Sequence, residues 1–252
     1  MGDSNSEYSI FIATPCYGGN VHVSYMESVM KLTSLCQKMN IKYLFFKIPF
    51  ESLIPRARNV CTAAFLKTEC THLLFLDSDI EFNPIDVFHM IKSKHDLIGG
   101  NYCTKHINGD SLISNAKKSN PNTSLNDLIA KSVGYTAHIS QRTEHQTIFE
   151  CTNIATGFML ISRKVILSII HHNQHLEYVN DIPAYTPCLN DNKLYNLFET
   201  KIIDNRYVSE DYGFCQLWIA CGGKIYTDLS IKLVHHGSMA YTGDPILKYS
   251  EE

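Results

Sequence analysis

The sequence predicts an α/β fold, in which an open and mostly parallel central sheet is flanked by helices. The first observation is that apolar runs of strand length alternate with stretches of helical periodicity. The second is that a run such as residues 73–76 is unbroken, which is typical of a strand buried on both faces. The third is that 252 residues with 44% hydrophobic content are enough to form such a core.

The N-terminal part begins with a strand, a helix and a second strand. Residues 8–13 form an apolar run that breaks at the glycine-containing turn TPCYGG, and residues 41–50 form another. Between them, residues 21–39 carry apolar side chains near helical spacing. Further strands are predicted at 72–82, 97–103 and 157–162, with helices starting at Pro55 and at Asn83-Pro84.

The pattern becomes irregular over residues 104–150. Within it, residues 133–139 and 146–154 resemble strands, and we expect them to form a hairpin or a lid. Towards the C-terminus, a helix should begin at Ser209 and stop at Gly222-Gly223, followed by short strands at 224–228 and 231–234.

Composition excludes several classes of protein. The net charge of -3, with both signs interspersed, provides no basic surface for nucleic acid. The nine cysteines are scattered without C-x-x-C pairs, which favours reduced thiols in a cytosol-like compartment over a disulfide framework or a zinc cluster. No apolar run approaches about eighteen residues, so neither a transmembrane helix nor a signal peptide is predicted.

The N-terminal sequence MGDSNS satisfies the pattern for N-myristoylation. However, Asp3 is acidic where basic residues would help, and a single acyl chain binds a membrane only marginally. We therefore expect an ordinary disordered start of a cytoplasmic protein and leave open its attachment to a membrane surface.

The motif most indicative of chemistry is Asp77-x-Asp79, which follows the unbroken apolar run. In an extended chain residues i and i+2 point to the same side, so both carboxylates can face one site. Two carboxylates at the end of a sheet strand suit a divalent cation that carries a phosphate-bearing substrate. The alternative is that they merely end a strand and cap a turn.

Two further groups of residues bear on the same site. Arg56, Arg58 and Asn59 crowd the start of a helix, where cations are unfavourable unless an anion meets them, and this predicts a phosphate or nucleotide contact. Glu210 and Asp211 follow Ser209 in the first turn of a later helix, which helix capping also explains.

In order, these motifs resemble those of GT-A-fold nucleotide-sugar glycosyltransferases, in particular the family 2-like inverting branch. The matching elements span residues 9–238 and are TPCYGG, PRARN, LLFLDSDI, GFMLIS, SEDYGF and VHHGS. The resemblance implies a single GT-A domain over residues 1–252, with a Rossmann-like nucleotide-sugar-binding half at 1–103 and an acceptor-binding and catalytic half at 104–252.

The resemblance also implies the roles of individual residues. Mn²⁺ or Mg²⁺ would be bound by Asp77, Asp79 and His235, with His236 as an alternative ligand to His235. Asp211 would be the catalytic base, with Glu210 beside it. The UDP- or GDP-sugar donor would be bordered by Thr14, Tyr17, Arg56, Arg58, Asn59, Asp77 and Ser78. The acceptor would be a glycan, a protein or a lipid.

Two other classes of protein remain alternatives. A haloacid-dehalogenase-like phosphohydrolase also begins with D-x-D after an apolar strand, but there the motif opens the core domain and normally continues to Thr or Val, whereas Ile80-Glu81 follows here. A non-catalytic sugar- or nucleotide-binding protein could use the same fold.

Overall fold

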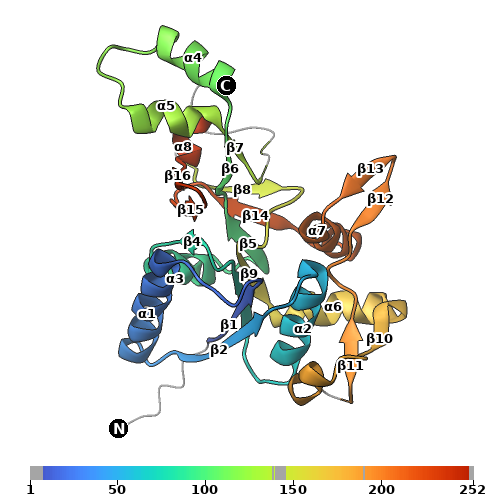
Figure 1. Cartoon of the computed structure of the whole chain (residues 1–252). Helices are drawn as coiled ribbons and strands as arrows, with labels where there is room; N and C mark the ends of the chain where they lie inside the picture. Colours follow the sequence, from blue (N-terminus) through green and yellow to red (C-terminus); the bar gives the residue numbers. More distant parts are fainter. Residues whose placement is uncertain (1–7, 138, 140–145, 190, 250–252) are drawn as a thin grey trace.

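The computed structural model describes residues 8–137, 139, 146–189 and 191–249, and its centre is a seven-stranded sheet (Figure 1). The strand order is β2-β1-β3-β9-β5-β14-β8, and β8 and β9 run antiparallel to the other five. The strands are β1 (Ser9–Cys16), β2 (Lys42–Pro49), β3 (His72–Leu76), β5 (Leu97–Gly100), β8 (Ile148–Cys151), β9 (Phe158–Ser162) and β14 (Ile225–Asp228). The predicted mixed, mostly parallel α/β sheet is thus confirmed, and both halves of the chain contribute strands to it.

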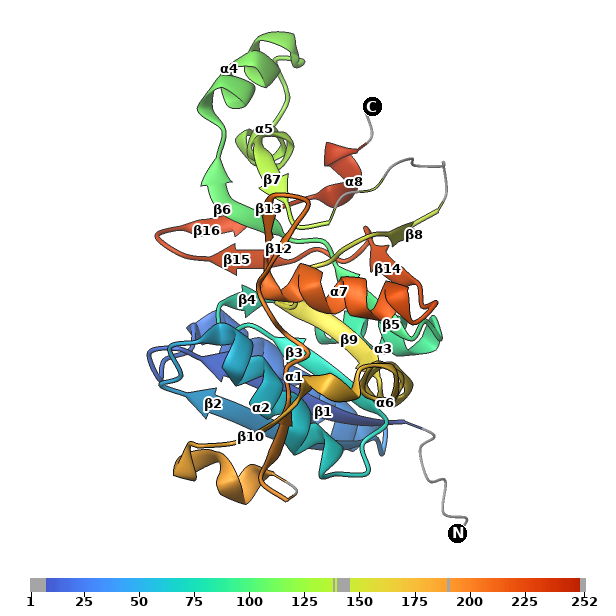
Figure 2. The ribbon, with the colours of Figure 1, turned by 90° about the vertical axis from the view of Figure 1, so that its right-hand side faces the viewer.

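Helices cover both faces of this sheet (Figures 1 and 2). They are α1 (Val23–Lys38), α2 (Ile54–Leu66), α3 (Pro84–Lys92), α6 (Arg163–His172) and α7 (Glu210–Ala220). Alternate residues of β1 point to opposite faces, so Ile10 and Ile12 join the core under α1 and α3, whereas Phe11 and Ala13 join the core under α2, α6 and α7. Residues 73–76 are fully buried, as their unbroken apolar run predicts.

A second body of structure projects from the carboxyl end of β5 and corrects the expectation for residues 104–150. It consists of β6 (Cys103–Ile107), α4 (Gly109–Lys118), α5 (Leu125–Ser132), β7 (Val133–Tyr135) and α8 (Pro245–Lys248), which we call the arm. The arm stands above the sheet in both ribbon views. The predicted hairpin of 133–139 with 146–154 is wrong, because β7 pairs with β6 and β8 pairs with β14.

Smaller elements surround the carboxyl ends of the strands. β4 (Ile80–Glu81), β15 (Val234–His236) and β16 (Ala240–Thr242) form a three-stranded sheet, and β12 (Lys201–Ile203) and β13 (Arg206–Val208) form a hairpin before α7. The 177–200 region contains β10 (Glu177–Val179), β11 (Lys193–Tyr195) and two short 3₁₀ turns, η1 (Gln174–Leu176) and η2 (Pro183–Cys188).

All nine cysteines are free, and seven of them are buried. Within the described ranges, the structure has no helix with both the length and the apolar character needed to cross a bilayer. The N-terminal pattern MGDSNS lies outside the described residues.

Candidate functional site

The two carboxylates of the D-x-D motif leave the sheet in different directions. β3 ends at Leu76, and the chain turns at once, because Ile80 N–H donates to the Asp77 carbonyl at 3.1 Å. The alternation that holds within a strand therefore does not apply beyond Leu76. Asp77 faces Arg58, whereas Asp79 faces Lys105 and His235.

Asp79 and His235 come together because β15 pairs with β4. His235 lies opposite Ile80 in that pairing, and His236 N–H donates to the Asp79 carbonyl at 2.9 Å. His235 Nδ1 lies 2.9 Å from the Cys103 carbonyl, which can only accept, so this nitrogen carries the proton. Burial lowers the pKa of His235, so the ring is neutral at pH 7 and its Nε2 is an acceptor.

Two acceptors therefore face each other 3.6 Å apart, namely His235 Nε2 and Asp79 Oδ1. A cation between them would relieve this arrangement, and a histidine whose other nitrogen donates to a carbonyl is oriented as metal-binding histidines are. The described residues contain no cluster of three or more Asp, Glu, His or Cys side chains arranged to hold a metal. A cation here would take two protein ligands, with the rest of its shell from phosphate oxygens and water, as Mg²⁺ commonly does.

The alternative ligand, His236, is directed elsewhere. Its Nε2 lies 2.8 Å from Glu81 Oε2, and its ring stacks on His22 with centroids 3.8 Å apart. The structure therefore separates the two histidines, with only His235 facing Asp79.

Arg58 joins the end of β3 to the start of α7. Its Nη2 donates to Asp77 Oδ1 at 3.1 Å, and its Nε donates to Glu210 Oε1 at 3.3 Å. The side chain is only 4% exposed. Burial alone would lower the pKa of Arg58, but the carboxylates of Asp77 and Glu210 outweigh that effect and raise it. Arg58 thus joins Asp77 to Glu210, which lies 152 residues after Arg58 in the chain, and its predicted contact with the donor stays a prediction.

Asp211 lies in the first turn of α7 beside this clamp. Its Oδ1 accepts from the Ser209 hydroxyl and from the Tyr212 N–H, the latter at 2.8 Å. Burial raises the pKa of Asp211 above its ordinary value, although the Ser209 hydrogen bond opposes the shift. Ser209 precedes the helix as predicted, yet its hydroxyl bonds to Asp211 and makes no capping bond to the backbone.

The other predicted donor contacts fall into two groups. Thr14 is buried and hydrogen-bonded to Tyr25, Ser78 accepts at its carbonyl from the His22 N–H at 2.8 Å, and Tyr17 is 75% exposed. Thr14 lies within β1, Tyr17 in the turn after it and Ser78 in the D-x-D turn, and the structure gives none of them a part in the Asp79–His235 pair.

Arg56 and Asn59 belong to structural contacts of α2. Arg56 donates twice to Glu51, at 2.6 and 2.8 Å, and Asn59 is buried, with its side-chain oxygen accepting from the Phe198 N–H at 3.0 Å. Burial alone would raise the pKa of Glu51, but hydrogen bonds from Arg56, Tyr185 and the Leu53 N–H hold it to about 2. The anion that meets Arg56 is therefore a carboxylate of the same chain.

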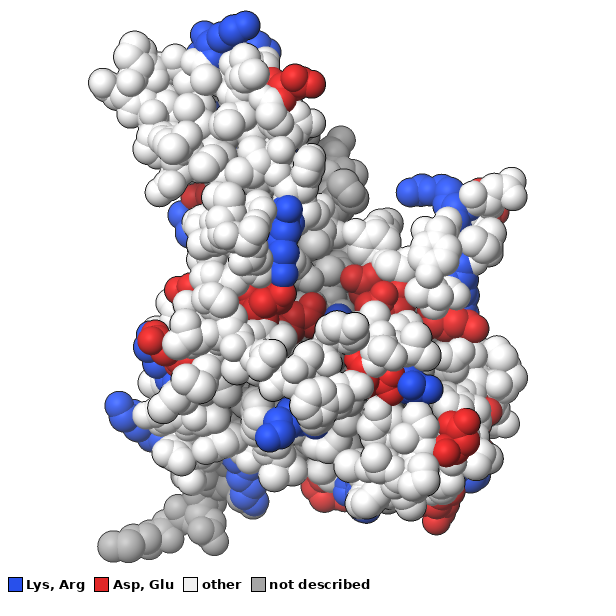
Figure 3. All heavy atoms as spheres, in the orientation of Figure 1, with Lys and Arg blue, Asp and Glu red and all other residues white. Residues whose placement is uncertain are grey.

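Sequence reasoning missed Lys105. Its ammonium forms an ion pair with Asp79 Oδ2, although it lies in the segment for which no pattern was recognised. In Figure 3 acidic side chains line a hollow below the arm, and a basic side chain descends to them. No local signal marks Lys105, because its contact with Asp79 depends on how β6 is placed by β7 and β15.

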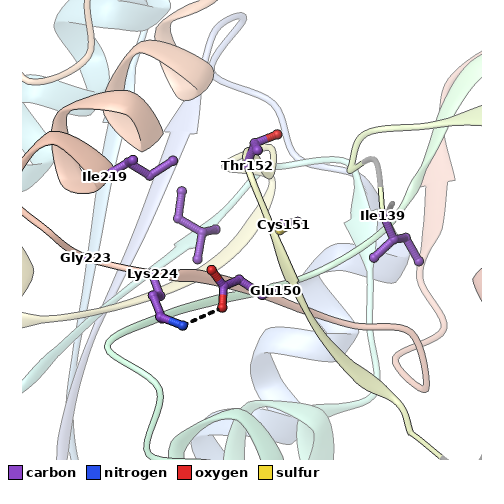
Figure 4. Close-up of a pocket in the computed structure, with 8 residues that line it drawn as sticks. Ile139, Glu150, Cys151, Thr152, Ile219, Gly223 and Lys224 are labelled. Atoms are coloured by element: carbon purple, nitrogen blue, oxygen red, sulfur yellow. Dashed lines mark hydrogen bonds and ion pairs between the residues drawn. The ribbon is translucent and has the colours of Figure 1, made fainter. Parts of the chain in front are cut away.

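A separate pocket of about 550 Å³ lies between α7 and β8 (Figure 4). Glu150 and Lys224 form an ion pair of 2.8 Å in its wall, with Ile219 and Thr152 on the other side. None of the predicted site residues lines it.

No known protein family and no curated protein matches the chain. Among solved structures, it is similar to A197 from STIV, with 15% identity, coverage of 91% of this chain and 86% of that one, and a TM-score of 0.46. It is also similar to a glycosyltransferase involved in the glycosylation of the major capsid of PBCV-1, with 13% identity, coverage of 69% and 68%, and a TM-score of 0.31. A third similar structure is HddC from Yersinia pseudotuberculosis, with 15% identity, coverage of 63% and 78%, and a TM-score of 0.28.

Proposed function

We propose that the protein is a GT-A-type glycosyltransferase. It transfers a sugar from a nucleoside-diphosphate sugar, such as a UDP- or GDP-sugar, to a hydroxyl group of a glycan, protein or lipid, with inversion at the anomeric carbon. The observation that carries the proposal is the pair of acceptors, Asp79 Oδ1 and His235 Nε2, facing each other 3.6 Å apart at the carboxyl end of the sheet.

The charges around this pair support an anionic substrate that arrives with a cation. Four carboxylates, those of Asp77, Asp79, Glu210 and Asp211, stand against the cations of Arg58 and Lys105. The described part of the site therefore carries about two negative charges in excess, which would repel a diphosphate. Mn²⁺ or Mg²⁺ held by Asp79 and His235 would neutralise that excess and, as a Lewis acid, stabilise the charge on the leaving diphosphate.

Asp211 is the proposed general base. The acceptor hydroxyl must lose its proton as it attacks, and a carboxylate whose pKa is raised towards neutrality accepts that proton more effectively. The two hydrogen bonds described for this carboxylate both use Oδ1, which leaves Oδ2 as the atom that accepts the proton. A base on the side of the sugar opposite the diphosphate gives inversion in a single displacement.

Asp77 and Glu210 act through Arg58 in this proposal. Asp77 holds one end of the guanidinium and Glu210 the other, so the start of α7 is fixed relative to the end of β3. Asp77 is accordingly proposed as a positioning residue beside the metal site, with Asp79 and His235 as the ligands.

The first test needs no knowledge of the acceptor. The wild-type protein is screened by thermal shift against UDP, GDP, ADP, dTDP and their common sugar derivatives, with Mn²⁺ and with EDTA. A ligand at a hundred times its Kd should stabilise the protein by about 2.7 kcal/mol, and only with Mn²⁺. Asp79→Asn should lose this stabilisation.

Asp96→Asn is the matched control for that test. Asp96 has the same 34% side-chain exposure as Asp79 and is also paired with a lysine, Lys164, at 2.7 Å. The control should retain the full metal-dependent shift. Equal shifts in Asp79→Asn and the wild type would refute the donor site.

The second test addresses the transfer itself. With the donor found above and a panel of sugar acceptors, Asp211→Asn should bind the donor normally but lose about 10² to 10⁴ in rate. The base must be ionised, and its pKa is raised above the ordinary value of about 3.9. The wild-type rate should therefore fall as the pH is lowered, and this fall should begin above about pH 4. NMR of the product reports its anomeric configuration, and a retained configuration would contradict the assignment of Asp211. Turnover of para-nitrophenyl phosphate instead would favour the phosphohydrolase alternative.

A further inference from the structure

Lys105 occupies the second oxygen of the proposed metal ligand Asp79. Its ammonium pairs with Oδ2, while Oδ1 faces His235 Nε2. Both side chains are about one third exposed, at 35% for Lys105 and 34% for Asp79, so solvent and small ligands can reach the pair.

The stem of Lys105 lies in a defined place. A Cβ atom at Gly237 would stand 2.9 Å from Lys105 Cδ, so the absence of a side chain at Gly237 makes room for the stem of the lysine. The backbone of Lys105 belongs to β6, the strand through which the arm joins the sheet. Gly237 follows β15 directly and lies two residues after His235. The lysine and the histidine therefore approach Asp79 from neighbouring strands.

Lys105 and a divalent cation would compete for Asp79. The single negative charge of Asp79 cannot balance both the ammonium group of Lys105 and a divalent cation. Both can stay beside Asp79 only if a further anion is present. The diphosphate of the donor is such an anion, and its oxygens suit both a metal ion and an ammonium group.

We propose that Lys105 is a second cation for the donor diphosphate. Lys105 pairs with Asp79 before the donor binds, and it pairs with the diphosphate when Mn²⁺ or Mg²⁺ binds Asp79 and His235. This inference rests on the proposed function and adds a phosphate-binding residue to it. Metal and diphosphate then bind cooperatively. The metal ion displaces Lys105 from Asp79, and the diphosphate provides the displaced lysine with a new partner.

The test measures two affinities that should change in opposite directions. Lys105→Met keeps most of the stem against Gly237 and removes the charge. Binding of Mn²⁺ alone is measured from the EPR signal of the free ion. Mn²⁺ should bind Lys105→Met several-fold more tightly than it binds the wild type, because Lys105 no longer competes for Asp79. Binding of UDP, GDP, ADP and dTDP to the wild type is measured by calorimetry in saturating Mn²⁺. The nucleotide that binds best should bind Lys105→Met about tenfold more weakly.

Lys164→Met is the control, because Lys164 forms the comparable exposed pair with Asp96, and neither affinity should change there. The coupling between Mn²⁺ and the nucleotide should be about 5- to 150-fold in the wild type and smaller in Lys105→Met, where only the direct contact of the metal with the diphosphate remains. Unchanged affinities in Lys105→Met would show that the lysine forms only a surface ion pair, and the proposed function would stand without it. Nucleotide binding by the wild type that EDTA leaves unaltered would overturn the exchange of partners. A wild type that binds none of the four nucleotides would overturn both proposals.

Discussion

Replacing Arg58 with methionine should destabilise the protein in a pH-dependent way. The guanidinium is buried between Asp77 and Glu210, so removing it leaves two carboxylates close together without their cation. Breaking a buried ion pair by removing one partner typically costs about 3–5 kcal/mol. Arg58 Nη1 has no hydrogen-bond partner among the described residues, and removing such a donor recovers about 1–3 kcal/mol. The midpoints of these two ranges leave an expected net loss of about 2 kcal/mol at pH 8.

The pH dependence follows from the two remaining carboxylates. Their repulsion is present when both are ionised and disappears when one takes up a proton, so the loss of stability should shrink as the pH is lowered from 8 to 5. Urea denaturation at both pH values measures the free energy of unfolding of the wild type and the variant.

Arg163→Met provides a matched comparison. Arg163 is half-buried, and its guanidinium donates to the carbonyls of Phe65, Thr68 and Cys70 at 2.7 to 3.1 Å. Carbonyls do not titrate, so this variant should lose the same stability at pH 5 and pH 8. A loss below 1 kcal/mol in Arg58→Met, or the same loss at both pH values, would refute the clamp between β3 and α7.

Two further predictions concern residues around the site. Because the pKa of Glu51 is held to about 2, its contribution of about 3 kcal/mol should be present above about pH 4.5 and be lost as the pH falls towards 2. Glu51→Gln should therefore be less stable than the wild type at pH 7 but equally stable near pH 2, and a pH-independent difference in urea denaturation would contradict this. In Gly157→Ala the new Cβ would lie 2.4 Å from the hydroxyl oxygen of Tyr102, which should cost about 1–3 kcal/mol and weaken Mn²⁺ binding. Gly109→Ala, where no atom lies within 4 Å of the new Cβ, should change neither quantity, and a Gly157→Ala protein as stable as this control would disprove the close approach.

Elements marked by local signals could be predicted from the sequence. The unbroken run 73–76 is a buried central strand, and Asn83-Pro84 starts α3 as predicted, with the Asn83 side chain accepting from the Ile85 N–H at 3.2 Å. The helices of the arm also carry such signals. Asn108 and Ser124 accept from backbone N–H groups three residues later, yet α4 buries no residue and most of its side chains are polar, so its few apolar side chains did not mark it as a helix.

The contacts within the site could not be predicted in the same way. Arg58 meets Glu210 across 152 residues and Lys105 meets Asp79 across 26, and both pairs depend on where separate elements pack. The sequence placed Arg58 at a helix start and predicted a phosphate or nucleotide contact, which stays a prediction. It could not show that Asp77 and Glu210 of the same chain pair with Arg58, because a guanidinium pairs with carboxylates as well as with phosphates.

The two halves of the site are held together by different kinds of contact. The half with the proposed base depends on Arg58, a buried ion-pair clamp between the end of β3 and α7. The half with the proposed metal ligands depends on the pairing of β15 with the two-residue strand β4, and on the main-chain bond from His236 N–H to the Asp79 carbonyl. β16, on the other side of β15, buries Tyr241 against Cys103 at the base of the arm. We therefore expect substitutions at the base of the arm to alter the contacts of His235 and Lys105 with Asp79 and to leave the Arg58 clamp unchanged, so that the proposed metal binding and base positioning respond to different substitutions.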